Sequence, residues 1–122
     1  MDLAHYKTQI GIIDDDHKEI YAMMRGLIAD ATNKIQVTEK LERLKEKLIE
    51  HIETEEEIMA QIQFPYLEYH KGAHLQFMEY LHFISVSSNL MNVKFLLQNL
   101  EVKFSKHIED YDMQIYPFIR QE

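Results

Sequence analysis

Hydrophobic residues recur along the chain at alternating steps of three and four, which is the period of an amphipathic α-helix. Four such stripes are separated by short breaks: the first begins around 14–16 and ends near 32–33, the second runs from Thr38 to the Phe64-Pro65 step, the third covers about 65–85 and the fourth about 92–111. Residues 85–89 are predicted to form a loop, and Pro117 marks a short C-terminal tail. The pattern predicts an all-α protein, an up-down-up-down four-helix bundle with an N-terminal arm and this tail.

The predicted helix ends follow from local chemistry. Asp14, Asp15 and Asp16 are expected to cap the first helix, because carboxylates satisfy exposed N–H groups and oppose the positive end of the helix dipole. Phe64 precedes a proline and therefore avoids helical backbone angles, so it is expected to end the second helix. A length of 122 residues fits one domain, 1–122.

The composition excludes several classes of protein. The chain has no cysteine, so we expect neither disulfides, nor a thiolate nucleophile, nor a cysteine-ligated metal site. The formal net charge of −8 has the wrong sign for a nucleic-acid partner. Apolar stretches are only a few residues long, and the first residues lack the apolar segment of a signal peptide, so we expect a cytoplasmic protein with no membrane span.

Every helical stripe carries histidine at a position where a hydrophobic residue belongs, and the second stripe also carries a glutamate. Any one of these residues alone would more commonly be an ordinary hydrogen-bonded core residue. Their joint placement is more informative, because an up-down-up-down bundle brings all of them to one end, facing inward. The residues in question are His17, His51, Glu55, His70, His74 and His107.

The spacing of these residues favours a metal site. Residues four apart share one helix face, so His70 and His74 can bind a single ion. The same spacing in the pair His51 and Glu55 lets the imidazole bind one ion while the two carboxylate oxygens reach between two ions. Five imidazoles with one or two carboxylates exceed the four ligands of a zinc site. They suit two first-row metal ions bridged by carboxylates, with iron favoured.

These motifs resemble those of the hemerythrin family, and specifically its single-domain prokaryotic members. The family signature is a histidine early in the first helix, followed in order by HxxxE, HxxxH and HxxxxD. The chain has His17 in IGIIDDDHKE, HIETE at 51–55, HKGAH at 70–74 and HIEDYD at 107–112. The resemblance covers essentially the whole chain, with one departure: Tyr6 of the N-terminal arm stands where family members often carry tryptophan.

The resemblance implies a centre of two iron ions joined by carboxylates and an oxo or hydroxo group. One iron would be bound by His70, His74 and His107, the other by His17 and His51, with Glu55 and Asp112 bridging the two. The second iron would then keep an open position at which dioxygen binds reversibly, for storage, delivery or sensing. No protein partner is implied.

Asp112 raises a geometric question. Five residues after His107, it would lie about 140° around an ideal helix from that residue. We therefore expect a π-bulge or a loosening of the last turn between the two, either of which would turn the carboxylate inward.

Apolar residues within a turn of the expected ligands are candidates for the walls of a dioxygen pocket, although they fit an ordinary core equally well. They are Ile20, Leu48, Ile52, Leu100, Phe104 and Ile108. Charged and polar residues off the stripes are expected to face solvent. These are Glu53, Glu56 and Glu57, with His5 and His82 as incidental histidines.

Other functions fit the same ligand set. A di-iron oxidase, a peroxidase or a nitric-oxide-handling enzyme would differ in the fate of the bound oxygen rather than in the ligands. Oxygen or redox sensing for a partner is a third hypothesis, and a plain bundle with incidental histidines is a fourth. Metal content and the visible spectrum of the purified protein would discriminate among them.

Overall fold

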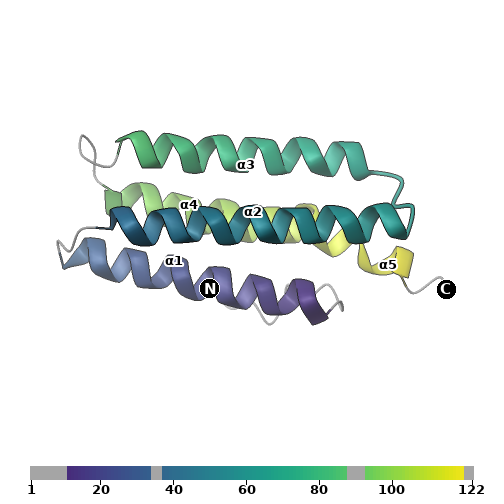
Figure 1. Ribbon diagram of the computed structural model, residues 1–122, viewed down its shortest axis with the longest axis horizontal. Helices are drawn as coiled ribbons and strands as arrows, with labels where there is room; N and C mark the ends of the chain where they lie inside the picture. Colours follow the sequence, from purple (N-terminus) through teal and green to yellow (C-terminus); the bar gives the residue numbers. More distant parts are fainter. Residues whose placement is uncertain (1–10, 34–36, 88–92, 120–122) are drawn as a thin grey trace.

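The computed structural model describes residues 11–33, 37–87 and 93–119. Its elements are α1 (Gly11–Thr32), α2 (Thr38–Gln61), α3 (Leu67–Ser87), α4 (Val93–Asp110), the 3-10 helix η2 (Asp112–Gln114) and the short α5 (Tyr116–Ile119). Successive long helices run in opposite directions, each packs against its neighbours in sequence, and α1 also packs against α4 (Figure 1). The predicted all-α, up-down-up-down four-helix bundle is confirmed. The N-terminal arm, with His5 and Tyr6, lies outside the described residues.

Two predicted helix ends are wrong. The aspartates at 14–16 lie inside α1, whose described part already begins at Gly11, so they do not cap it. The predicted loop at 85–89 is helical as far as Ser87, and its last two residues lie outside the described ranges. Ser85 fits inside the helix because its Oγ donates a hydrogen bond of 3.3 Å to the carbonyl of Leu81, one turn earlier.

The end of α2 falls close to the predicted Phe64-Pro65 step and has a defined motif. The amide of Phe64 donates to the carbonyl of Met59 (2.9 Å), and that of Gln63 donates to Ala60 (3.1 Å). With Gln63 at a φ of 55°, these bonds form a Schellman motif, in which the left-handed residue is more commonly glycine. Phe64 is buried against Met59, and this contact fixes the direction in which the chain enters α3.

The apolar core consists of two clusters separated by polar side chains. The larger cluster includes Ile20, Leu48, Leu81, Leu97 and Phe104, and it fills the bundle on one side of the inward-facing histidines. The smaller cluster lies on the other side and closes that end of the bundle; its buried members are Ile13, Met59, Phe64 and Ile115. The predicted C-terminal tail therefore contributes to the core, because Ile115 follows η2 and Phe118 of α5 packs against the same cluster.

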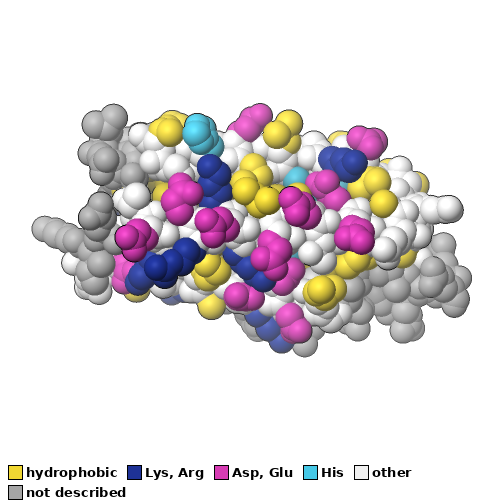
Figure 2. All heavy atoms as spheres, in the orientation of Figure 1, with side chains coloured by type: hydrophobic (Ala, Val, Ile, Leu, Met, Phe, Trp, Pro, Cys, Tyr) yellow, Lys and Arg dark blue, Asp and Glu magenta, His cyan; other side chains and the backbone are white. Residues whose placement is uncertain are grey.

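The surface carries the charges expected from the composition. On the face shown in Figure 2, acidic side chains are spread among lysines and arginines, and the basic residues do not gather into one patch. Within the described ranges, no helix combines the length and hydropathy that crossing a membrane requires.

Candidate metal centre

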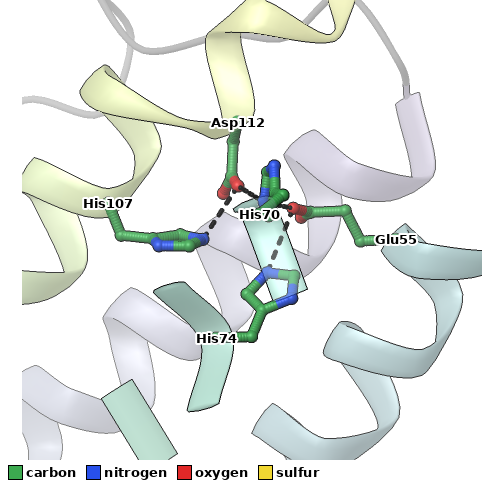
Figure 3. A group of neighbouring side chains, drawn as sticks. All are labelled: Glu55, His70, His74, His107 and Asp112. Carbon is green, nitrogen blue, oxygen red and sulfur yellow. Dashed lines mark ion pairs between the residues drawn. The ribbon is translucent and has the colours of Figure 1, made fainter. Parts of the chain in front are cut away.

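Seven side chains predicted from the sequence as metal ligands converge between the two apolar clusters. Helix α1 contributes His17, α2 contributes His51 and Glu55, α3 contributes His70 and His74, α4 contributes His107, and η2 contributes Asp112. Figure 3 shows five of them, with the two carboxylates between the histidines. Both carboxylate side chains are 0% exposed, and five histidines from the four long helices surround them; four of these histidines are buried, and the side chain of His107 is 10% exposed.

The side chain of Glu55 divides its oxygens between two sets of histidines. Oε1 lies 2.6 Å from Nε2 of His70 and 3.3 Å from Nε2 of His74, both on α3. Oε2 lies 3.0 Å from Nε2 of His51, one turn earlier on α2. A carboxylate in this position has one oxygen for each of two neighbouring ions.

Asp112 divides its oxygens in the same way. Oδ1 lies 2.8 Å from Nε2 of His70 and 3.0 Å from Nε2 of His107, whereas Oδ2 lies 2.9 Å from Nε2 of His17. Two groups of donor atoms result, each confined within 4.8 Å, and the two carboxylates belong to both groups. The three-histidine group contains His70, His74 and His107, and the two-histidine group contains His17 and His51.

Asp112 reaches the centre because α4 ends just before it. The α-helix stops at Asp110, Tyr111 leaves the helical region with φ −121° and ψ −55°, and the 3-10 turn then starts at Asp112. The loosening predicted between His107 and Asp112 is confirmed, and it occurs at the helix end, without a π-bulge in this described segment. The change of winding turns the carboxylate inward.

The donor atoms fit a metal centre better than a hydrogen-bonded core. Nε2 of His17, His70, His74 and His107 and all four carboxylate oxygens are buried without a properly oriented hydrogen bond among the described residues. Unpaired buried groups of this kind are costly. Two atoms that each lie about 2.1 Å from one ion are about 3.0–3.4 Å apart, close to most of the N···O distances here. Cations would therefore satisfy every one of these atoms.

The protein groups alone favour charged side chains at this centre. Burial raises the pKa of Glu55, but the surrounding imidazoles outweigh it and hold that pKa well below its usual range. Burial lowers the pKa of His17 and of His70, but the carboxylates of Asp112 and Glu55 raise each of these pKa values to about 9. Burial and Glu55 raise the pKa of Asp112, but its histidine neighbours lower that pKa by more, so that it lies below its usual range. The two carboxylates therefore stay negatively charged and attract cations.

Two carboxylates outside the centre hold the outer nitrogens of two histidines. Nδ1 of His51 lies 3.0 Å from Oδ2 of Asp16, and Nδ1 of His74 lies 2.9 Å from Oε2 of Glu56. Such bonds fix the ring so that Nε2 points at the metal. Asp16 is itself held by the ammonium of Lys47 at 3.1 Å.

Neither of these two roles was predicted from the sequence. A solvated face was predicted for Glu56, which is wrong because its side chain is only 25% exposed, and a helix cap was predicted for Asp16. Both residues lie one position off the apolar stripe, where helical period alone does not separate them from their exposed neighbours Asp15 and Glu57. Glu57, like Glu53 and His82, is exposed as predicted.

A small cavity of about 10 Å³ adjoins both groups of donors. Its walls are His51 of the two-histidine group, His74 and His107 of the other, and the apolar residues Leu48, Ile52, Phe77 and Phe104. Its volume is close to the smallest that holds a single water molecule. Three of the six predicted pocket residues thus line it. The other three, Ile20, Leu100 and Ile108, are buried in the larger apolar cluster instead, and Phe77 was not predicted.

Comparison with known families identifies the architecture. Residues 8–119 match the family model of the hemerythrin HHE cation binding domain, so the chain belongs to the hemerythrin family. No curated protein and no solved structure matched the chain. Together with the buried cluster of histidines and carboxylates, the family assignment makes this a metal-binding protein of the hemerythrin type.

Proposed function

We propose that the protein holds two iron ions and binds dioxygen reversibly beside them. In this proposal His70, His74 and His107 bind one ion, His17 and His51 bind the other, and the carboxylates of Glu55 and Asp112 bridge the pair. The division of each carboxylate between the two histidine groups supports two ions rather than one. Imidazole with carboxylate is a donor set that suits iron.

The two ions would differ in how many protein donors they have. The three-histidine group offers five donors, and the two-histidine group offers four, since the bridging carboxylates serve both. His17 and His51, with the two carboxylates, would therefore leave more positions of a six-coordinate ion for an outside ligand than the three-histidine group would. Two ferrous ions held by these residues would supply the two electrons that dioxygen takes up on binding and returns on release.

The observation that carries the oxygen-binding proposal is the small apolar cavity. It is bounded by proposed ligands of both ions, and its volume of about 10 Å³ is close to the smallest that holds one water molecule, so it suits only a very small ligand. Leu48, Ile52, Phe77 and Phe104 exclude water, which would promote oxidation of the centre. Among its described lining residues, the histidine ligands are the only groups that carry a proton to donate, so the cavity walls favour release of oxygen over its reduction.

The donor set itself also favours a carrier over a di-iron oxidase. Five imidazoles and two carboxylates bring less negative charge than carboxylate-rich di-iron centres, so high oxidation states of iron are less stabilised. An oxygen carrier requires this property, because its iron must return to the ferrous state.

Cycles of oxygenation test the proposal. Protein loaded anaerobically with ferrous iron should contain two irons per chain, develop a visible absorption band in air, and lose the band under vacuum over repeated cycles. His70→Gln should lose this behaviour, and His82→Gln, which removes an exposed histidine of the same helix, should keep it. A band that forms once and decays irreversibly would contradict a carrier and favour an oxidase, a peroxidase or a nitric-oxide-handling enzyme.

A further inference from the structure

A second, larger pocket opens to the surface between α3 and α4, next to the metal centre. Its volume is about 260 Å³, and its lining includes Gln76, Phe77 and Tyr80 of α3 and Lys103, Lys106 and His107 of α4. The volume is just under the range of about 300–1,000 Å³ that is typical of pockets for drug-sized ligands. Ala73, a small side chain, also lines the pocket and leaves it open. The space suits a small molecule.

The charge of the pocket favours an anion. The ammonium of Lys106 is 3.5 Å from Oδ1 of Asp110, which partly neutralises it. Lys103 lies over the ring of Tyr80, 4.9 Å from its centroid, and no carboxylate of the described residues is within ion-pair distance of its ammonium. The lining thus has two positive charges and one negative charge, on a protein whose formal net charge is −8. The excess of positive charge in the pocket therefore attracts an anion, although the protein as a whole repels it.

The residues that line the pocket favour a molecule of a particular shape. Phe77, Tyr80 and Tyr111 present aromatic rings to the pocket, and Tyr111 also stacks on His107 with centroids 5.2 Å apart. Aromatic walls favour a flat, apolar body through stacking and burial. A molecule with such a body and one anionic end would meet both kinds of lining.

His107 supplies the link to the metal centre. Nε2 of His107 faces Asp112 at 3.0 Å, and the other ring nitrogen points away from the carboxylates in Figure 3. The outer nitrogens of His51 and His74 have Asp16 and Glu56 as partners, but no carboxylate among the described residues takes this place at His107. The imidazole lines a lysine-containing pocket instead.

We propose that this pocket binds a small aromatic carboxylate, whose anionic group pairs with Lys103 and Lys106 and accepts a hydrogen bond from Nδ1 of His107. Its carboxylate would then hold His107 as Asp16 holds His51. This site goes beyond oxygen binding and depends on protein groups alone, so it stands whichever metal the centre contains.

Binding of 4-fluorobenzoate to the purified protein, followed by fluorine NMR, tests the site. We expect saturable binding, at least tenfold weaker for the neutral analogue 4-fluorobenzyl alcohol. The double variant Lys103→Gln/Lys106→Gln should weaken binding of the carboxylate at least tenfold. The double variant Lys18→Gln/Lys45→Gln makes the same change of charge on α1 and α2, and its affinity should stay within twofold of the original.

Ala73→Leu tests the pocket without removing a charge. The larger side chain should fill the space and abolish binding while both lysines remain. Unchanged affinity in this variant or in the Lys103→Gln/Lys106→Gln protein would overturn the proposal, and would show that the probe binds elsewhere, for example directly at the metal. Absence of saturable binding to the original protein would overturn it as well. Each of these outcomes is independent of whether the centre binds dioxygen reversibly.

Discussion

The larger apolar cluster and the metal centre occupy successive levels of the same four helices but are stabilised in different ways. On α2, Leu44 and Leu48 are followed at the same helical spacing by His51 and Glu55, and all four are buried. The aliphatic level gains free energy simply by leaving water. The polar level loses free energy on burial unless its charges are paired. One level of the bundle is therefore stabilised by burial itself, whereas the next needs partners for its charges, which bound cations would supply.

A single substitution is expected to change the free energy of unfolding by similar amounts at the aliphatic level and at the polar level. Truncation of a buried leucine typically costs about 2–5 kcal/mol. Moving a charged group out of water costs several kcal/mol of desolvation free energy, which its buried partners must offset. Breaking a buried ion pair costs about 3–5 kcal/mol. We therefore expect the polar level to be the weaker part of the metal-free fold and the stronger part of the metal-loaded one.

Removal of metal is the largest expected perturbation. A chelator should lower the free energy of unfolding by more than any single core substitution, that is, by more than about 5 kcal/mol, since apparent binding energies of structural metals are about 10 kcal/mol or more. Hydrogen exchange should speed up most in the turns around Glu55, His70 and His107. Amides near Leu97, in the larger apolar cluster, should lose less protection, by no more than the fall in the free energy of global unfolding.

The substitution Leu97→Ala is the matched control for that experiment. It opens a cavity at a fully buried position of the aliphatic level and should cost about 2–5 kcal/mol with or without metal. Metal content should not change. Uniform loss of protection along all four helices on chelation would show that the two levels are not energetically distinct.

The contrast between the two levels also separates what the sequence predicts from what it does not. The fold and the seven converging residues could be predicted, because polar residues placed in phase with an apolar stripe must point inward. His51 and Glu55 are such residues, and the topology alone brings them to the level of His70. The residue types along the stripe therefore already distinguish the aliphatic level from the polar level.

Features that depend on the rotation of neighbouring helices could not be predicted in this way. Ile20 and Ile108 are as close in sequence to the histidines as Leu48 is, but only Leu48 faces the small cavity. The C-terminal end of α3 was also predicted two residues too early, because Ser85 satisfies its hydroxyl within the helix instead of starting a loop. A stripe gives the inward direction but not the neighbour that each side chain meets.

The pH dependence of the metal-free protein is expected to be the next largest effect. The pKa of His17 and of His70 is raised from 6.5 to about 9, so their contribution to stability is complete below pH 6.5 and disappears as the pH rises through 9. The pKa of Glu55 is lowered, so its contribution is present above pH 4.5 and disappears as the pH falls. The free energy of unfolding should therefore fall by a few kcal/mol between pH 6.5 and 9.

The metal-loaded protein should respond in the opposite direction up to about pH 8. Protons compete with metal ions for the imidazoles, so stability should rise as the pH increases from 5 to 8. Chemical denaturation at several pH values, with and without chelator, checks both slopes. Leu97→Ala should shift both curves without changing their slopes, and two parallel curves for loaded and metal-free protein would contradict the assignment of these charges to the metal centre.

The smallest expected effect distinguishes the two halves of the centre from each other. Asp16→Asn removes the charge behind His51, and Glu56→Gln removes the charge behind His74, but each amide oxygen can still accept the hydrogen bond. Loss of such an outer partner typically costs about 10–100-fold in metal affinity, and we expect the lower end because the bond survives. Lys47, which lies 3.1 Å from both Asp16 and Glu19, can stay paired with Glu19 after the first change.

Competition with a chelator, followed metal by metal, measures this difference. Asp16→Asn should weaken one ion about tenfold and Glu56→Gln the other, because their histidines belong to different donor groups. Asp15→Asn and Glu57→Gln are the matched controls, since they remove the same charge from the adjacent, exposed position of each helix. Equal losses of metal affinity in the controls would show that the effect arises from the change in net charge alone. Equal weakening of both ions by one variant would mean that Glu55 and Asp112, which belong to both donor groups, couple the two halves so tightly that the centre loads as a single unit.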